Sequence, residues 1–218
     1  MKTRKPNPPI YQTLLKHYGA QHWWPGKSKF EIVVGCILTQ NTNWRNVERS
    51  IANLLMQGID TEEKYLELSE AAIKELIRPS GYQTAKGQTL QRLCNWLLSH
   101  SSFDGVQSIP TQQLRNELLS IKGIGPETAD AILLYAMERP VTVSDAYTKR
   151  IAVRLGALPT LATYDDCVTW LTTLAPLTVP EQNELHALIV AHGKLTCHKR
   201  NPACDKCPLQ NHCARIGG

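Results

Sequence analysis

The sequence lacks any long apolar segment. Its 218 residues contain no run of about 18 apolar residues, so we expect no membrane-spanning helix. Residues 1–9 are basic and rich in proline, but no apolar stretch follows them, so they do not form a secretory signal. We therefore expect a cytoplasmic protein in a reducing compartment, where disulfide bonds are rare.

Strand patterns are missing as well. No segment of useful length alternates apolar and polar residues, and no internal repeat or low-complexity tract occurs beyond residues 1–9. Residues 140–143 are too few to make a sheet. Helical periodicity predominates, so the sequence predicts an all-α fold with helices that include residues 44–55, 84–98, 126–137, 145–155, 164–174 and 180–192.

Several residues are placed to start helices. Ser28 and Glu31 form a capping box, in which each side chain can bind a backbone amide that the first turn leaves open. Asp60, Ser69 and Thr111 are expected to cap three further helices.

The charge is only mildly unbalanced. Lys and Arg number 24 against 19 Asp and Glu, which gives a formal net charge of +5. This excess is compatible with a nucleic-acid partner, but many basic proteins of this size bind nothing anionic. Charge alone therefore does not decide the class of partner.

The cysteines are unevenly distributed. Four of the seven lie in the last 22 residues, as Cys197-x6-Cys204-x2-Cys207-x5-Cys213. Four thiolates within 17 residues indicate a metal centre. A four-cysteine zinc site is a common use of such residues, but a zinc ribbon normally has two Cys-x2-Cys pairs and this segment has one. The remaining three stand in apolar helical contexts and are expected in the core: Cys36, Cys94 and Cys167.

A glycine pair lies between two predicted helices. Gly123 and Gly125 let the backbone turn sharply, and Gly125 comes directly before a helix that opens with Pro126. Free amides at such a helix start favour a phosphate group, although an ordinary turn between helices would look similar. Asp145 follows 20 residues after Gly125. It is suited to a helix N-cap, a role that Ser144 could also fill.

These elements together resemble the helix-hairpin-helix DNA glycosylases of the endonuclease III superfamily, over nearly the whole chain. The resemblance implies that Asp145 is the catalytic aspartate and that Gln40 enters the space left by a flipped base. It also implies that the hairpin binds the DNA backbone through Lys122, Gly123 and Gly125. The cysteine spacing is similar to that of the family's [4Fe–4S] loop, so the expected cluster ligands are Cys197, Cys204, Cys207 and Cys213.

One branch of this superfamily, the 3-methyladenine DNA glycosylases, is more similar still. Its best-known member lacks the cluster, and there the present sequence departs from it. Endonuclease III carries a lysine nucleophile where this sequence has Glu127, which cannot form a Schiff base. The likeness implies a catalytic site of Asp145 and Glu127, and a base pocket made by Trp23, Trp24, Pro25, Trp44 and Glu127.

The resemblance also implies two helical lobes. Residues 29–138 are expected to form a helical barrel lobe with the hairpin, and residues 1–28 with 139–218 a lobe that holds the cluster. The expected partner is double-stranded DNA with a damaged base, bound by a monomer associated with the nucleoid.

Three functions fit these residues. The first is a monofunctional glycosylase for alkylated purines such as 3-methyladenine, and the second an endonuclease III-like glycosylase and AP lyase for oxidised pyrimidines. The third is a non-catalytic iron–sulfur protein that binds DNA or senses redox state. That protein would need neither Asp145 nor Gln40, and both are present.

Overall fold

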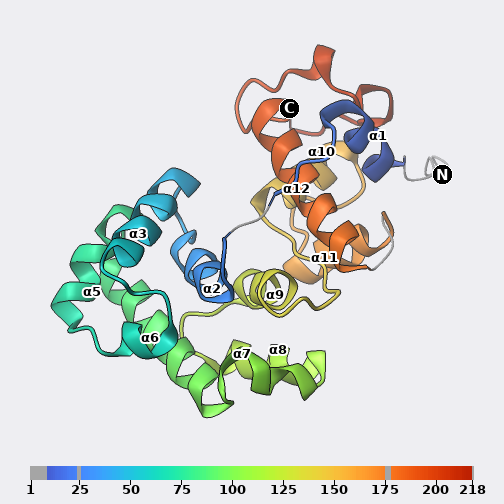
Figure 1. Cartoon of the computed structure of the whole chain (residues 1–218). Coiled ribbons are helices and arrows are strands. Elements are labelled where there is room, and N and C mark those ends of the chain that lie inside the picture. The colour runs from blue at the N-terminus through green and yellow to red at the C-terminus, as the bar shows by residue number, and fades with distance from the viewer. Residues whose placement is uncertain (1–8, 24–25, 175–177, 218) are drawn as a thin grey trace. The chain divides into compact units, whose positions relative to one another are not determined.

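The computed structural model describes residues 9–23, 26–174 and 178–217, and every regular element in these ranges is a helix (Figure 1). The predicted all-α fold is confirmed. None of the described helices is both long and apolar enough to span a bilayer. The chain divides into two compact units. We call residues 24–139 the hairpin unit, and residues 1–23 with 140–218 the cysteine unit.

The hairpin unit is built around α2, which spans Lys29–Leu38. All residues from Phe30 to Leu38 except Glu31 are buried, because the helix packs against α3, α6 and α9 at once. The other elements of this unit are α3 (Trp44–Met56), α4 (Glu62–Leu66), α5 (Glu70–Leu76), η1 (Arg78–Ser80), α6 (Gln83–Ser99), α7 (Ser102–Gly105), η2 (Val106–Ser108), α8 (Thr111–Ser120) and α9 (Pro126–Tyr135).

Ser28 and Ser69 are confirmed as N-caps, and of the predicted Ser28–Glu31 capping box the structure shows the half in which Ser28 accepts. The Ser28 hydroxyl accepts a hydrogen bond from the Glu31 amide at 3.1 Å, and the Ser69 hydroxyl accepts one from the Ala72 amide at 3.2 Å. Each satisfies an amide that has no partner within the helix.

For two other helices, α4 and α8, the predicted N-cap residue is wrong by one position. Thr61, not Asp60, caps α4 by accepting from the Lys64 amide, while the Asp60 carboxylate pairs with the Lys64 ammonium at 2.7 Å. Thr111 is the first residue of α8, and Pro110 occupies the cap position.

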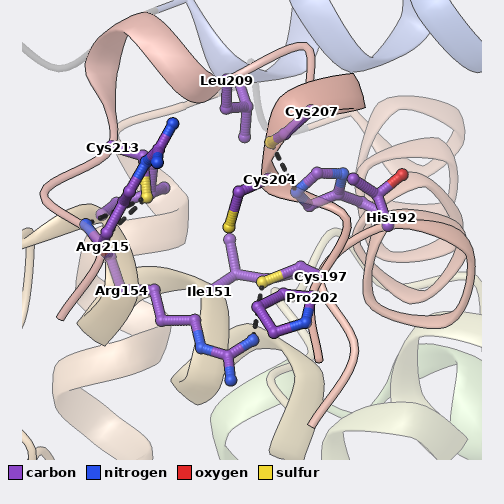
Figure 2. A pocket seen from close by; sticks show the side chains of 12 residues that line it. Ile151, Arg154, His192, Cys197, Pro202, Cys204, Cys207, Leu209, Cys213 and Arg215 are labelled. Carbon is purple, nitrogen blue, oxygen red and sulfur yellow. Dashed lines mark hydrogen bonds between the residues drawn. The ribbon is translucent and has the colours of Figure 1, made fainter. Parts of the chain in front are cut away.

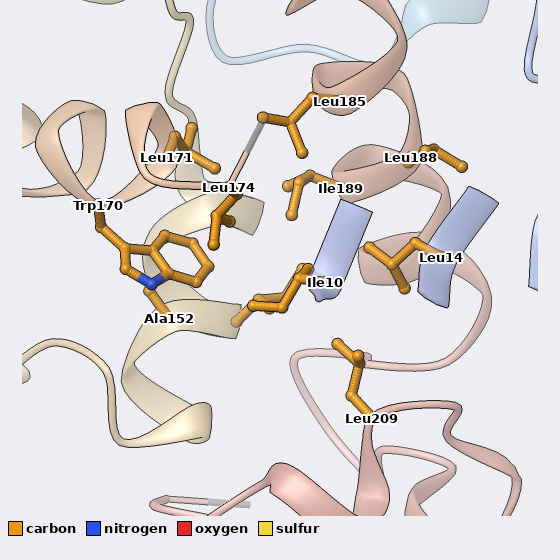
Figure 3. Close-up of a cluster of buried hydrophobic side chains, with 11 residues drawn as sticks. Ile10, Leu14, Ala152, Trp170, Leu171, Leu174, Leu185, Leu188, Ile189 and Leu209 are labelled. Carbon is orange, nitrogen blue, oxygen red and sulfur yellow. The ribbon is translucent and has the colours of Figure 1, made fainter. Parts of the chain in front are cut away.

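The cysteine unit packs around one apolar core (Figure 3). Its helices are α1 (Ile10–Tyr18), α10 (Ala146–Leu155), α11 (Tyr164–Thr172) and α12 (Val179–Leu195), followed by the short turns η3 (Cys204–Lys206) and η4 (Gln210–His212). Leu209 joins the cysteine segment to this core. The core comprises Ile10, Leu14, Ile151, Ala152, Trp170, Leu171, Leu174, Leu185, Leu188, Ile189 and Leu209.

The three cysteines outside the C-terminal segment are buried, as predicted. Burial raises the pKa of Cys36 to about 12 and that of Cys94 to about 12, and it also raises the pKa of Cys167. These thiols therefore stay protonated near neutral pH and act as small apolar core residues.

An ion pair fixes the two helices of the hairpin. Arg115 of α8 donates from Nε to Asp130 Oδ1 at 2.7 Å and from Nη2 to Oδ2 at 3.0 Å. Asp130 lies on α9, and its side chain is only 5% exposed. This two-point geometry is rigid, so it sets the spacing of the helices on either side of the turn.

Arg115→Met should therefore destabilise the hairpin unit. We expect the free energy of unfolding to fall by about 1–3 kcal/mol, because a buried carboxylate loses its bidentate partner. Urea denaturation followed by circular dichroism measures this. The control is Arg78→Met, which removes an exposed pair with Glu75 at 3.8 Å and should change stability by about 0.5 kcal/mol or less. Equal effects of the two variants would contradict this account.

Candidate functional site

The turn between α8 and α9 requires glycine at one position. Gly123 has a φ of 103°, and a Cβ added there would lie 2.1 Å from Thr89 Oγ1. Both the backbone conformation and the lack of space exclude a side chain. Gly125 differs, because a Cβ there would meet nothing within 4 Å. The start of α9 is therefore open to a ligand.

Two side chains of α6 bind the same backbone carbonyl of the hairpin, that of Lys122. Thr89 Oγ1 donates to the Lys122 carbonyl at 3.3 Å, and Arg92 Nη1 donates to the same oxygen at 3.2 Å. In a trans peptide the next amide points the opposite way, so the Gly123 N–H faces away from α6. The Lys122 side chain is exposed. The hairpin thus offers an amide, an open helix start and a cation, which together can bind a phosphate.

Gln40 lies against this hairpin. It follows the end of α2, and its Nε2 donates to the Gly123 carbonyl at 3.2 Å and to Thr128 Oγ1 at 3.0 Å. The fold thereby brings together two predicted DNA-binding residues that are 83 positions apart in the sequence. Both roles remain predictions.

Sequence reasoning missed Lys86, which supports the Gln40 segment. Its ammonium is buried and donates to the Leu38 carbonyl at 2.8 Å and to the Ser80 carbonyl at 2.7 Å. Burial lowers the pKa of this group. Lys86 thus connects the end of α2 to the turn before α6. Tyr82 in that turn is exposed. Its position on the buried side of a helical stripe was the available sequence signal.

Glu127 and Trp44 both belong to the hairpin unit. Glu127 is exposed in the first turn of α9, where the helix dipole favours a carboxylate. Trp44 begins α3, and its ring lies over Gly35 of α2, so that a Cβ there would be 3.3 Å from the indole. This contact leaves the indole half-buried.

Asp145 is the N-cap of α10 in the cysteine unit. Its Oδ1 accepts from the Thr148 amide at 2.8 Å and from the Thr148 hydroxyl at 3.0 Å. The Asp145 amide donates back to that hydroxyl at 3.3 Å, which completes a capping box. The helix cap therefore uses only one of the two carboxylate oxygens, and Ser144 does not fill this role.

The second oxygen faces a histidine that sequence reasoning missed. His186 Nε2 of α12 lies 3.7 Å from Asp145 Oδ2, and the two side chains are only 10% and 12% exposed. Burial raises the pKa of Asp145, but attraction to His186 and the bonds from Thr148 outweigh it, so this pKa lies below its usual range. His186 is one of two histidines in α12, and its place in the apolar part of this helix was the available sequence signal for the pair.

Trp23 lies next to this pair. Its ring centroid is 5.3 Å from that of His186, and the planes are tilted by 48°. Trp24 and Pro25, the adjoining residues of the expected base pocket, lie outside the described residues.

The four C-terminal cysteines line a single pocket, shown in Figure 2. Arg154 of α10 reaches it and donates from Nη1 to Cys197 Sγ at 3.3 Å and to the His198 carbonyl at 2.6 Å. His192 Nε2 lies 3.9 Å from Cys207 Sγ. Arg154 and His192 were not identified from the sequence, because their positions in the helical pattern do not reveal which loop they contact.

The pocket suits a cluster of several metal atoms. Burial raises the pKa of Cys207, and negative charge on the other three cysteines raises it further, so a cationic centre is needed for all four thiolates to form together. Among the described residues, no three His, Cys, Asp or Glu side chains are close enough to hold a single metal ion.

Two family profiles match the chain. The one described as HhH-GPD superfamily base excision DNA repair protein matches residues 34–175. The iron–sulfur binding domain of endonuclease III matches residues 197–213, which begin and end at the outer two of the four cysteines. The chain therefore carries a [4Fe–4S] cluster as its cofactor.

Relatives match over most of the chain. A protein of Methanocaldococcus jannaschii named as a DNA repair glycosylase is 44% identical, with 94% of each chain covered. Endonuclease III of Sulfolobus acidocaldarius is 28% identical over 86% of this chain and 83% of its own length.

Solved structures share the fold. The H. pylori 3-methyladenine DNA glycosylase bound to 1,N6-ethenoadenine is 30% identical, with a TM-score of 0.70 over 85% of this chain and 94% of its own. A trapped covalent intermediate of endonuclease III with DNA has a TM-score of 0.79 over 94% and 93% of the two chains, at 22% identity. That second likeness concerns the fold alone.

Removing one thiolate should disrupt the cluster. The wild-type protein should contain iron and be yellow-brown, and Cys204→Ser should lose visible absorbance, iron and thermal stability, because the loop loses a ligand that organises it. Cys167→Ala, in the same unit but outside the pocket, should keep its iron. Stoichiometric zinc in the wild type, or full iron content in Cys204→Ser, would contradict the assignment.

Proposed function

Because the chain belongs to the HhH-GPD superfamily and is a base excision repair DNA glycosylase, we propose that it is a monofunctional enzyme for alkylated purines such as 3-methyladenine. The observation that carries this proposal is Glu127, which occupies the first turn of α9 directly after the hairpin. A carboxylate there cannot attack the sugar as an amine would. The 30% identity to a 3-methyladenine DNA glycosylase supports the same choice.

We propose that the hairpin binds the backbone of double-stranded DNA. The outward amide of Gly123, the open start of α9 at Gly125 and the exposed Lys122 are the groups that contact phosphate. Gln40 is bound to the same turn, so its side chain starts next to the DNA backbone. From there it enters the space that a flipped base leaves in the stack.

We propose Asp145 as the catalytic carboxylate. Breaking the bond between C1′ and the base leaves positive charge on the sugar, and a buried carboxylate stabilises that charge strongly. The lowered pKa keeps this group ionised at neutral pH. Oδ1 holds the helix cap, so Oδ2 is the oxygen available to the sugar and to the attacking water.

An alkylated purine suits these residues chemically. A base such as 3-methyladenine is cationic in DNA, so it takes the bonding electrons and leaves neutral, without a proton from the enzyme. Water then adds to C1′ and releases a proton. In the hairpin unit, Glu127 attracts the cationic base and Trp44 offers it an aromatic face.

Asp145→Asn should lose excision while keeping the fold and DNA affinity. Asparagine caps a helix as well as aspartate does, so the variant removes charge but preserves the first turn of α10. We expect the single-turnover rate to fall by at least about 100-fold. The control Asp166→Asn alters an exposed capping box on α11 and should leave the rate unchanged. Near-normal turnover of Asp145→Asn would mean that this residue is only a cap.

A panel of single-lesion duplexes tests the substrate and product. We expect release of 3-methyladenine with an intact abasic site, strand breakage only after alkali, and no covalent adduct on borohydride treatment, since no Schiff base forms. Glu127→Gln should slow excision of cationic bases more than that of a neutral lesion, because only the former are attracted by its charge. Glu70→Gln, also in a first helical turn of the hairpin unit, is the matched control.

Two results would overturn the proposal. Efficient borohydride trapping together with excision of oxidised pyrimidines would assign the chain to the endonuclease III class. Equal losses of cationic and neutral substrates in Glu127→Gln would remove this residue from base recognition.

A further inference from the structure

We propose that His186 is a positioning residue that keeps Asp145 charged while leaving its Oδ2 oxygen available to the sugar. This inference rests on the proposed catalytic role of Asp145. It adds His186, a residue of a different helix, α12, as the partner that keeps the Asp145 carboxyl group ionised.

The two carboxylate oxygens have different surroundings. Oδ1 is held by two hydrogen bonds from Thr148, which fix the carboxyl plane at the start of α10. Oδ2 faces His186 Nε2 at 3.7 Å, which is too long for a direct hydrogen bond but short for an electrostatic attraction. His186 therefore stabilises the charge without occupying the oxygen that the reaction needs.

Burial makes this attraction effective. Both side chains are about nine-tenths buried, so water screens the pair little. Trp23 lies beside the imidazole, with the two ring centroids 5.3 Å apart. A buried carboxylate with no compensating partner would instead take up a proton at higher pH.

Few other groups act on this carboxyl. From its own helix they are the amide and hydroxyl of Thr148, and from α12 His186. The thiol of Cys167 on α11 senses the charges of both Asp145 and Lys149, and burial keeps that thiol protonated. His186 is thus the histidine whose charge bears on Asp145.

The sign of the effect follows from this arrangement. The positive charge of the imidazole attracts the carboxylate of Asp145, and the pKa of Asp145 lies below its usual range. Without that charge the pKa of Asp145 rises. Excision requires the carboxylate, so the pH at which the rate falls on acidification should move to a higher value.

Single-turnover excision measured against pH, at saturating enzyme, tests the proposal. The substrate is the duplex that the lesion panel identifies, and visible absorbance monitors the cluster at each pH. His186→Gln keeps an amide nitrogen near the place of Nε2 but carries no charge. We expect its acid limb to move to higher pH, with the plateau rate retained within about threefold. His186→Leu, with neither charge nor donor, should show the same movement and a plateau lower by about tenfold or more.

The matched control is His100→Gln in the hairpin unit. It also breaks a histidine–carboxylate pair, with Glu117 at 3.2 Å, and should leave the acid limb where it is. An unmoved limb in both His186 variants would overturn the proposal, even with a lowered plateau, because loss of packing alone does not shift a titration. Asp145→Asn separates the two claims: if it is inactive while the limb is unmoved, only the role of His186 fails, and if it is active, the role of Asp145 fails too.

Discussion

The catalytic role that we propose requires Asp145 to be buried and charged at the same time. Burial strengthens its interaction with a developing positive charge, but burial also favours protonation, which would abolish that interaction. The first turn of α10 resolves this conflict with two hydrogen bonds from Thr148, and α12 adds the nearby imidazole of His186. The site therefore requires α10 and α12 to keep a fixed separation.

The cysteine segment maintains that separation from the other end of the same helices. Arg154, in the last turn of α10, binds Cys197 Sγ and the His198 carbonyl, and Cys197 lies two residues after Leu195, the last residue of α12. Leu209 of the same segment is buried in the core shared by both helices. A cluster bound by the four thiolates would hold this segment against the helices that carry Asp145 and His186.

Local patterns in the sequence are sufficient to predict most of the longer helices and two of the caps. The Ser28 hydroxyl acts within one turn, so its role is visible in four consecutive letters. The α1 helix escaped notice, because it is short and is held by packing against α12. Asp60 is not the cap of α4, because its neighbour Thr61 has an equally suitable side-chain oxygen and stands at the N-cap position, directly before Glu62.

Among the candidate site residues, those with a local sequence signal could be predicted, and those that depend on distant partners could not. The offset of Asp145 from the hairpin fits either a helix cap or a catalytic role. The structure shows that Oδ1 forms the cap. The catalytic role that we propose uses Oδ2. His186 pairs with Asp145, which is 41 positions away, and Lys86 binds the carbonyl of Leu38, which is 48 positions away. No local pattern in the sequence encodes such distant pairings.

The central claim is that Asp145 stabilises positive charge on the sugar. Equilibrium binding to two abasic-site analogues tests it most directly, one with a cationic pyrrolidine ring in place of the sugar and one with a neutral tetrahydrofuran ring. The wild type should bind the cationic ring more tightly than the neutral one, and Asp145→Asn should lose this preference while binding the neutral ring as before. Equal affinity of the wild type for both rings would contradict it.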